Sequence, residues 1–264
     1  MEIRRLTADD VATAVEISTA AGWNQTASDW STIIALNPET CFGIDCEGRL
    51  VSTATLVCYG NRLAWVGMVL TRPEFRRQGF ARMLLERAIQ AADARGIRTV
   101  KLDATEQGQP LYEALGFIAE QAVERWAGPG VEDGRWATVG ALPGELDTQA
   151  FGASREALLL RLATSAQPLT APDGYVMRRK GQLAAYLGPC VARTPQTAEQ
   201  LIRAALRHHT GPWFWDILPE NSNAVLLVRK LGFTVDRKLV RMFRGEPLRG
   251  KEGWIYALTG FELG

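Results

Sequence analysis

The chain has 264 residues, 47% of them hydrophobic, which is enough to bury the cores of two domains of ordinary size. Its 30 basic and 29 acidic residues nearly balance, and no basic run exceeds Arg178-Arg179-Lys180, so the sequence lacks the electrostatic footprint of a nucleic-acid-binding protein. It shows neither an apolar leader segment nor an apolar run of membrane-spanning length, which argues against a membrane partner and predicts a cytoplasmic protein.

The cysteines and histidines do not form a metal-binding pattern. The 4 cysteines contain no C-x-x-C pair, and the only 2 histidines, His208 and His209, are adjacent in the sequence. We therefore predict reduced thiols and no bound metal.

The first 70 residues give alternating strand and helix signals. Residues 3–6 read as a strand, and Thr7 with Asp10 forms the capping signal of a helix over residues 8–21 that ends at Gly22. A second helix is predicted over residues 27–36. Three strand-like runs follow, separated by glycine-containing turns, which predicts an antiparallel meander over residues 41–45, 50–59 and 63–70.

The stretch 66–95 combines the end of a strand, a basic turn and a long helix. The apolar alternation stops before Pro73, which cannot donate to a sheet ladder, and helical spacing of apolar residues begins at Ala81. A glycine between them lets the backbone approach a ligand, and the unpaired N–H groups and the dipole of a helix start attract anions. The turn is therefore predicted to bind phosphate, with solvated arginines at an ordinary helix start as the alternative. Its residues are Arg76, Arg77, Gln78, Gly79, Phe80 and Ala81.

After this helix the sequence predicts a strand over residues 99–103, a short helix over 110–115 that Gly116 ends, and a strand over 117–126. Residues 128–145 are rich in glycine and proline and read as a linker. A first structural unit is thus expected to end near residue 128.

The glycine turn and the segment Leu111-Tyr112-Glu113-Ala114-Leu115-Gly116-Phe117, at this separation, make residues 1–127 resemble the GNAT superfamily of acyl-CoA-dependent N-acyltransferases. The resemblance implies an α/β (α+β) fold with a mixed, mostly antiparallel central sheet flanked by helices. It also implies acetyl-CoA as the co-substrate, with its pyrophosphate on the turn. The pantetheine arm would lie in a splayed gap of the sheet, beside Met68, Val69 and Leu70.

Two catalytic roles follow from the same resemblance. The backbone N–H near Val69 corresponds to the donor that binds the thioester oxygen, a small oxyanion hole. Tyr112, which also borders the cofactor, corresponds to the general acid. A phenol with a reference pKa of about 10 stays protonated at neutral pH and can protonate the departing thiolate. Because both substrates are held together, direct attack needs no covalent enzyme intermediate.

The acceptor side is less sharply defined. In the GNAT fold the first two helices lie over the acceptor entrance, so Trp23, Asn24, Asp29 and Trp30 are candidate acceptor contacts. The same residues fit structural roles equally well, as core anchors, a turn residue and a first-turn acid.

The general base is not identified by the sequence. An alkylammonium must lose a proton before it attacks, and Asp103, Glu106 or Glu124 could accept that proton directly or through water. Asp103 and Glu124 are therefore included among the candidate substrate-binding residues.

The second half of the sequence repeats the first. Residues 102–117 match 215–233 with three extra residues, and 123–128 match 240–245. The corresponding turn has Pro195 and no glycine, and Val228 stands where the first half has Tyr112. We therefore predict two tandem GNAT-like domains: a catalytic domain at 1–128, a linker at 129–145, and a degenerate domain at 146–264. The degenerate domain either forms a wall of the acceptor pocket or only supports folding by burying apolar area.

These patterns predict an enzyme, an N-acetyltransferase that moves an acetyl group from acetyl-CoA to the primary amine of a small molecule. Three alternatives stay open: a CoA-binding regulatory module without turnover, a partner-binding structural protein, and acetylation of a protein amine. The sequence identifies neither the acceptor nor the oligomeric state, and it leaves open whether the acyl group is longer than acetyl.

Overall fold

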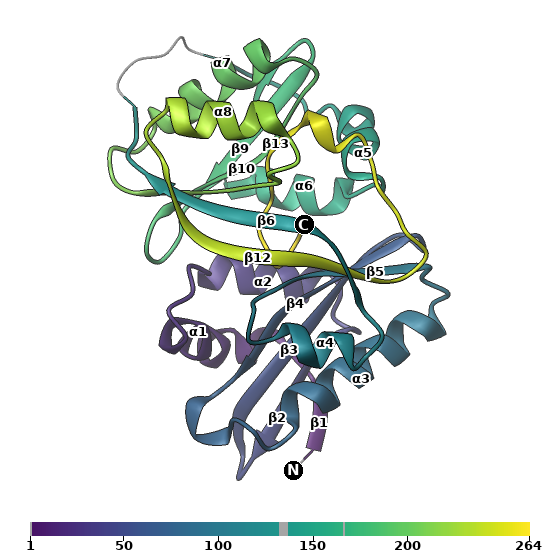
Figure 1. Ribbon diagram of the computed structural model, residues 1–264. Helices are drawn as coiled ribbons and strands as arrows, with labels where there is room; N and C mark the ends of the chain where they lie inside the picture. Colours follow the sequence, from purple (N-terminus) through teal and green to yellow (C-terminus); the bar gives the residue numbers. More distant parts are fainter. Residues whose placement is uncertain (1, 132–136, 166) are drawn as a thin grey trace.

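The computed structural model describes residues 2–131, 137–165 and 167–264 (Figure 1). Its strands form one continuous 13-stranded sheet, in the order β1-β2-β3-β4-β5-β12-β6-β11-β10-β9-β8-β7, with β13 paired to β10. Figure 1 shows helices against this sheet, with the first half of the chain (residues 2–128) below and the second half (residues 138–264) above. The fold is the mixed, mostly antiparallel α/β fold that the sequence predicts.

The first half follows the predicted order closely. Its strands are β1 (Glu2–Arg5), β2 (Cys41–Cys46), β3 (Arg49–Tyr59), β4 (Leu63–Thr71), β5 (Thr99–Ala104) and β6 (Ile118–Gly128). Its helices are α1 (Val11–Ala20), α2 (Ala27–Leu36), α3 (Phe80–Ala94) and α4 (Gln109–Glu113), with short 3-10 turns η1 (Ala8–Asp10) and η2 (Pro73–Phe75). The predicted capping box at Thr7 is present and starts η1, which continues into α1.

The second half contains strands that the sequence does not indicate. Its strands are β7 (Thr138–Val139), β8 (Leu169–Ala171), β9 (Gly174–Arg179), β10 (Ala185–Ala192), β11 (Trp213–Ile217), β12 (Thr234–Gly245) and β13 (Ile255–Ala257). Its helices are α5 (Gly144–Phe151), α6 (Glu156–Ser165), α7 (Pro195–Leu206) and α8 (Ser222–Lys230), with the 3-10 turn η3 (Glu252–Trp254). The hairpin of β8 and β9 stands where the sequence shows no clear first strand.

The two halves exchange strands at the middle of the sheet. β12, from the second half, pairs antiparallel with β5 of the first half. β6, from the first half, pairs antiparallel with β11 of the second half, and β6 and β12 also pair with each other. Both strands cross the middle of the molecule in Figure 1. The halves therefore share one sheet instead of packing two sheets across a linker.

The division into residues 1–128 and 146–264 remains a prediction about sequence segments, and residues 132–136 of the proposed linker lie outside the described residues.

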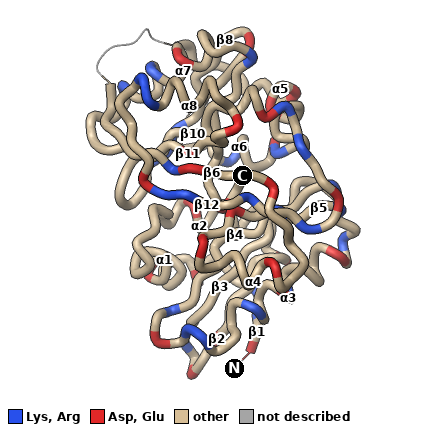
Figure 2. Tube along the Cα trace, viewed as in Figure 1, with Lys and Arg blue, Asp and Glu red and all other residues tan. Residues whose placement is uncertain are grey.

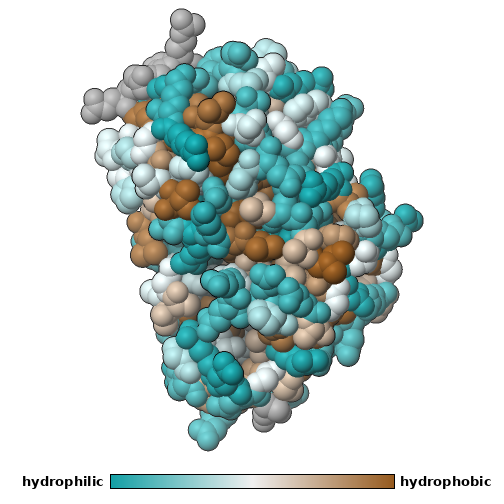
Figure 3. Space-filling view, in the orientation of Figure 1, coloured by the Kyte–Doolittle hydropathy of each residue, from teal (hydrophilic) through white to brown (hydrophobic). Residues whose placement is uncertain are grey.

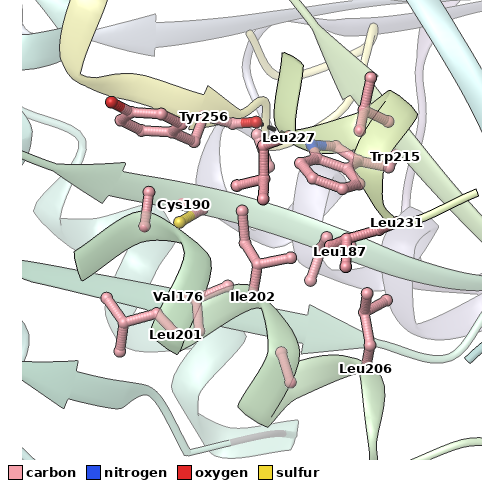
Figure 4. Packing of buried hydrophobic residues seen from close by; sticks show 14 of the residues in the cluster. Val176, Leu187, Cys190, Leu201, Ile202, Leu206, Trp215, Leu227, Leu231 and Tyr256 are labelled. Carbon is pink, nitrogen blue, oxygen red and sulfur yellow. Dashed lines mark hydrogen bonds between the residues drawn. The ribbon is translucent and has the colours of Figure 1, made fainter. Parts of the chain in front are cut away.

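Each half buries its own apolar cluster. In the first half, α3 places Leu84, Leu85 and Ala88 against the sheet at helical spacing. In the second half, Leu201 and Ile202 of α7 pack among residues of β9 to β11, and Figure 4 shows Tyr256 and Trp215 on the same cluster. Side chains from α8 and β13 complete this second cluster.

Hydrophilic residues cover most of the face shown in Figure 3, with hydrophobic residues gathered mainly around its middle and upper part. Within the described ranges, every helix is too short or too polar to cross a lipid bilayer.

Candidate active site

β4 and β5 separate partway along their length. They pair as parallel strands only from Leu63↔Thr99 to Trp65↔Lys101. β5 then continues along β12, whereas β4 is bulged: its register with β3 shifts, and Met68 has a φ of 49°. Because a bulge disrupts the ladder and bends the strand, the sheet opens here. The gap expected from the GNAT resemblance is therefore present between β4 and β5.

The basic turn follows β4 and leads into α3. Arg77 and Gly79 have φ values of 64° and 84°, and Gly79 is the N-cap of α3. Alternating left- and right-handed residues turn successive backbone N–H groups into one concavity, a nest for anions, and the helix dipole adds positive potential. No described atom outside the turn lies within 4 Å of the place where a Cβ of Gly79 would stand. The backbone of this turn thus fits a pyrophosphate.

The side chains of the turn have different surroundings. Phe80 is buried and stacks on Phe75 with ring centroids 6.4 Å apart, which anchors the start of α3. Arg76 Nε donates to the Thr71 carbonyl at 3.2 Å, and Arg77 is exposed. The guanidinium groups therefore lie at the surface of the nest, and Phe80 supports it from the core.

Tyr112 lies on α4, which follows β5. Its ring meets Phe117 edge-on, with centroids 6.1 Å apart. Gly108 leaves room for this ring, since a Cβ there would be 3.0 Å from Tyr112 Cε2. Burial raises the pKa of Tyr112 to about 12. The phenol therefore keeps its proton at neutral pH and can deliver it to a leaving group.

A pocket of about 100 Å³ connects the opening of the sheet with the second half of the chain. One side is formed mainly by the bulged part of β4, the end of β5 and α4, and includes Gly67, Met68, Val69, Asp103 and Tyr112. The facing side includes Trp23, Gln25, Arg125, Arg237, Phe261 and Glu262. Both halves of the chain therefore build the pocket.

The last residues of the chain form one wall of the pocket. Trp65 Nε1 donates to the Phe261 carbonyl at 2.8 Å, and the Tyr59 hydroxyl donates to the Leu263 carbonyl at 2.7 Å. Gly67 permits this contact, since a Cβ there would be 2.7 Å from the carbonyl oxygen of Glu262. We call residues 259–264 the tail segment. In Figure 1 the C-terminus lies between the two halves.

Glu262 is the buried acid of the tail segment, with 3% of its surface exposed. Its Oε1 accepts a hydrogen bond from Arg179 Nη2 at 3.0 Å, and its Oε2 accepts one from Gln25 Nε2 at 3.0 Å. Arg179 also donates to Asp29 at 2.9 Å, so one guanidinium serves two carboxylates. Burial raises the pKa of Glu262, and the charge of Arg179 acts in the opposite direction.

Two further arginines beside the pocket are held by bidentate ion pairs. Arg125 donates to Asp216 at 2.7 and 2.8 Å, and Arg241 donates to Asp103 at 2.8 and 3.0 Å. Each pair is buried, and its two charges offset each other. Both oxygens of Asp103 are therefore engaged by Arg241.

Among the residues predicted for the acceptor side, Trp23 and Asp103 line the pocket, and Asn24, Asp29 and Trp30 are not among the lining residues. The Asn24 side chain binds the backbone of Leu183 and Ala184 across the two halves. Asp29 caps α2 and is linked to the lining residue Glu262 through their shared partner Arg179. Trp30 is fully buried and donates to Ser18 Oγ at 3.2 Å.

The structure also places the three candidate bases in different surroundings. Glu106 is exposed, and Glu124 accepts a hydrogen bond from Trp126 Nε1 at 3.1 Å and lies 3.8 Å from Lys238 Nζ. Of the three candidates, only Asp103 lines the pocket.

Sequence reasoning missed Gln25, Arg125, Arg237 and Glu262. Gln25 adjoins the predicted pair Trp23 and Asn24, so its position was the one available signal. Glu262 gave no signal in the sequence, because its partners Gln25 and Arg179 are 237 and 83 residues away along the chain.

The second half has a matching opening, but the chain itself fills it. β10 and β11 pair as parallel strands only from Ala185↔Trp213 to Leu187↔Trp215. Beyond that point β13 pairs with β10 at Cys190↔Ala257 and Val191↔Ile255. On the other side, Leu258 N donates to the Asp216 carbonyl at 2.8 Å, and Trp215 Nε1 donates to the Tyr256 carbonyl at 2.7 Å (Figure 4). β13 therefore occupies the space between β10 and β11.

Two family models match the chain, and both describe GNAT acetyltransferases. The model of the "Acetyltransferase (GNAT) family" matches residues 11–117, and that of the "Acetyltransferase (GNAT) domain" matches residues 144–257. The chain belongs to the GNAT acetyltransferases, with two such domains in tandem, and it is an acyltransferase enzyme.

The chain is similar over most of its length to a sequence relative and to solved structures. The chain is 26% identical over 244 residues to YitH, an uncharacterised N-acetyltransferase of Bacillus subtilis (strain 168), a match that covers 83% of this chain and 82% of YitH. The crystal structure of a putative acetyltransferase from Pyrococcus horikoshii superposes with a TM-score of 0.90 at 22% identity, covering 100% of this chain and 95% of that one. A GCN5-related N-acetyltransferase from Sphaerobacter thermophilus superposes with a TM-score of 0.65 at 16% identity, covering 94% and 97%. At these identities the structural matches bear on the fold alone.

Proposed function

We propose that this enzyme transfers the acetyl group of acetyl-CoA to the primary amine of a small molecule, with both substrates bound at once. The observation that carries the proposal is the pocket where Tyr112, the bulged part of β4 and a buried acid from the tail segment meet. A pocket of about 100 Å³ lined from both halves suits a small acceptor better than a segment of protein chain. A cytoplasmic location stays a prediction from the sequence.

The residues of the first half suit the acetyl-CoA side of the reaction. Acetyl-CoA supplies the acetyl group as an activated thioester. The nest at residues 76–81 binds the pyrophosphate, and the gap between β4 and β5 accepts the extended arm. A backbone N–H near Val69 donates to the thioester oxygen, and Tyr112 gives its proton to the departing sulfur.

Removal of the acceptor's proton is assigned to Glu262. Asp103 also lines the pocket, but both of its oxygens accept hydrogen bonds from Arg241, which holds it as an ion pair. Oε2 of Glu262 accepts a hydrogen bond from the neutral amide of Gln25, and Arg179 donates to the other oxygen, Oε1. Burial raises the pKa of Glu262, which brings a carboxylate closer to the basicity that proton abstraction near neutral pH requires.

The test is an acceptor screen with acetyl-CoA. A panel of small primary amines and a panel of lysine-containing peptides are incubated separately with the enzyme, and both thiol release and the mass gain of one acetyl group are measured. We expect acetylation of small amines and none of the peptides. Acetylation of peptides alone would move the assignment to protein amines. Saturable acetyl-CoA binding with no transfer to any amine would favour a regulatory module.

A further inference from the structure

The geometry points to an acceptor that carries an anionic group as well as its primary amine, of which a small amino carboxylate is the simplest example. This inference rests on the proposed transfer to a small amine and adds the chemical class of that amine. Two places in the pocket carry it, one suited to a cation and one suited to an anion.

The cation place lies at Gln25 and Glu262. Gln25 is 8% exposed and lines the pocket, and its Oε1 has no hydrogen-bond partner among the described residues. Because its Nε2 donates to Glu262, the orientation of the amide is fixed and Oε1 remains a free acceptor. A buried acceptor without a donor is costly, and a substrate ammonium would supply the missing donor. The same ammonium would lie next to the base, Glu262.

The local charge count also leaves room for a cation. Glu262 and Asp29 share one guanidinium, that of Arg179. When both carboxylates are ionised, the group has one negative charge in excess, and a buried excess charge is unfavourable unless a partner neutralises it. A substrate ammonium would be that partner.

The anion place lies at Arg125 and Arg237. These two residues stand directly opposite each other in the register of β6 and β12, and both line the pocket. Like charges at directly opposed positions destabilise a sheet. Figure 2 shows basic residues along the first part of β12, where it crosses the middle of the molecule.

Only one of the two arginines has an acid partner. Arg125 is neutralised by Asp216 through Nε and Nη2, which leaves its Nη1 without a hydrogen bond among the described residues. Arg237 is exposed and makes no hydrogen bond or ion pair with any described residue. Its fork of N–H donors matches a carboxylate or a phosphate, so an anionic group of the acceptor would supply the partner that Arg237 lacks.

The test compares matched acceptors that differ in the anion alone. Amino carboxylates are compared with the corresponding amino amides and with the amines that lack the carboxyl group, and aminoalkyl phosphates form a separate arm. We expect kcat/KM to be roughly 10- to 100-fold higher for an anionic acceptor than for its neutral match, the scale of one charge-assisted hydrogen bond. The two anionic arms identify which anion is preferred. Equal or better use of the neutral amines would overturn the inference while leaving the proposed function intact.

Two variants and one control locate the effect. Arg237→Gln should bring the ratio between anionic and neutral acceptors close to one, mainly through KM. Gln25→Leu should raise KM for both classes alike, because both carry the amine. Lys238→Gln makes the same charge change one residue along β12, at a side chain outside the pocket lining, and should keep the ratio of the wild type. An unchanged ratio in Arg237→Gln would contradict the anion place.

A binding measurement keeps the inference testable if no amine is turned over. Amino carboxylates at millimolar concentration should raise the thermal unfolding temperature of the wild type and should not raise that of Arg237→Gln. The matched neutral amides should give a smaller rise in the wild type. An equal rise with amides and carboxylates, or no rise with either, would overturn the inference.

Discussion

The two halves of the sheet contain the same opening and use it differently. In each half, a parallel pair of strands holds together for three register positions and then separates. In the first half the space beyond Trp65 and Lys101 adjoins the pocket with Tyr112. In the second half β13 fills the corresponding space with backbone hydrogen bonds. An opening in the sheet can thus be filled by an extended piece of the same chain.

The filled opening brings residues of the second half to the pocket of the first half. By filling the second opening, β13 carries the chain to the junction of the two halves, and the tail segment continues from there to the first pocket. Glu262 and Phe261 therefore reach a site whose other lining residues are mostly far away in the sequence. The second half therefore contributes Phe261 and Glu262 to the lining of the pocket in the first half.

The largest expected effect tests the phosphate turn of the first half. Gly79→Glu should abolish measurable acetyl-CoA binding, because the added carboxylate would repel the pyrophosphate, and a side chain at a φ of 84° is strained. Isothermal titration calorimetry measures the affinity. Gln196→Glu places the same charge in the first turn of α7 and should leave binding unchanged. Unaltered affinity in a folded Gly79→Glu protein would place the pyrophosphate elsewhere.

The next effect concerns the acid that only the first half retains. Tyr112→Phe should keep the acetyl-CoA affinity and lower turnover by about 10²-fold or more, the usual scale of a lost general acid. Tyr256→Phe removes a hydroxyl from β13 in the second half and should leave turnover unchanged. Steady-state kinetics with a saturating acceptor measure the turnover of the two variants. If Tyr112→Phe turns over normally, water or another group protonates the thiolate.

The elements of the first half could be predicted from the sequence because each gives a local signal. The helix before Gly96 follows from apolar spacing, and the turn at Gly79 follows from its glycine beside a helix start. Tyr112 was singled out because it belongs to a seven-residue motif that ends at Phe117. Each of these features depends on neighbours close in sequence.

The exchange of β6 and β12 could not be predicted in the same way. The two strands have similar residue patterns in the sequence. Neither pattern therefore shows which half of the sheet its strand will join. β13 has three residues, which is too short for a periodic signal. The partners of Glu262 depend on the final fold, so its place in the pocket became visible only in the structure.

A smaller effect tests the contribution of the tail segment to the first half. Glu262→Gln should lower turnover by about 10-fold, less than the usual cost of a lost base, because the neutral fraction of the amine can react without it. Because the base must be deprotonated, the wild-type rate should rise with pH through the raised pKa of Glu262. That rise should be absent in Glu262→Gln. The pH at which the wild-type rate rises should be the same for acceptors of different amine pKa. If the rise came from deprotonation of the acceptor, that pH would change with the pKa of the acceptor.

The smallest expected effect on acetyl-CoA binding comes from loosening β13. Tyr256→Ala truncates a side chain that is 1% exposed, and the free energy of unfolding should fall by about 3 to 5 kcal/mol, as for other buried aromatic side chains. Urea unfolding measures this loss. The variant should still bind one acetyl-CoA per chain with the affinity of the wild type.

The second opening is closed by β13, and its turn also lacks the features of a phosphate site. The turn has Pro195 at the start of α7, and Thr194 already caps the Thr197 N–H. A pyrophosphate that leaves water needs nearly every donor of such a nest, so clearing the space alone does not create a site. Titration to two equivalents, in the wild type or in Tyr256→Ala, would show that both halves bind the cofactor.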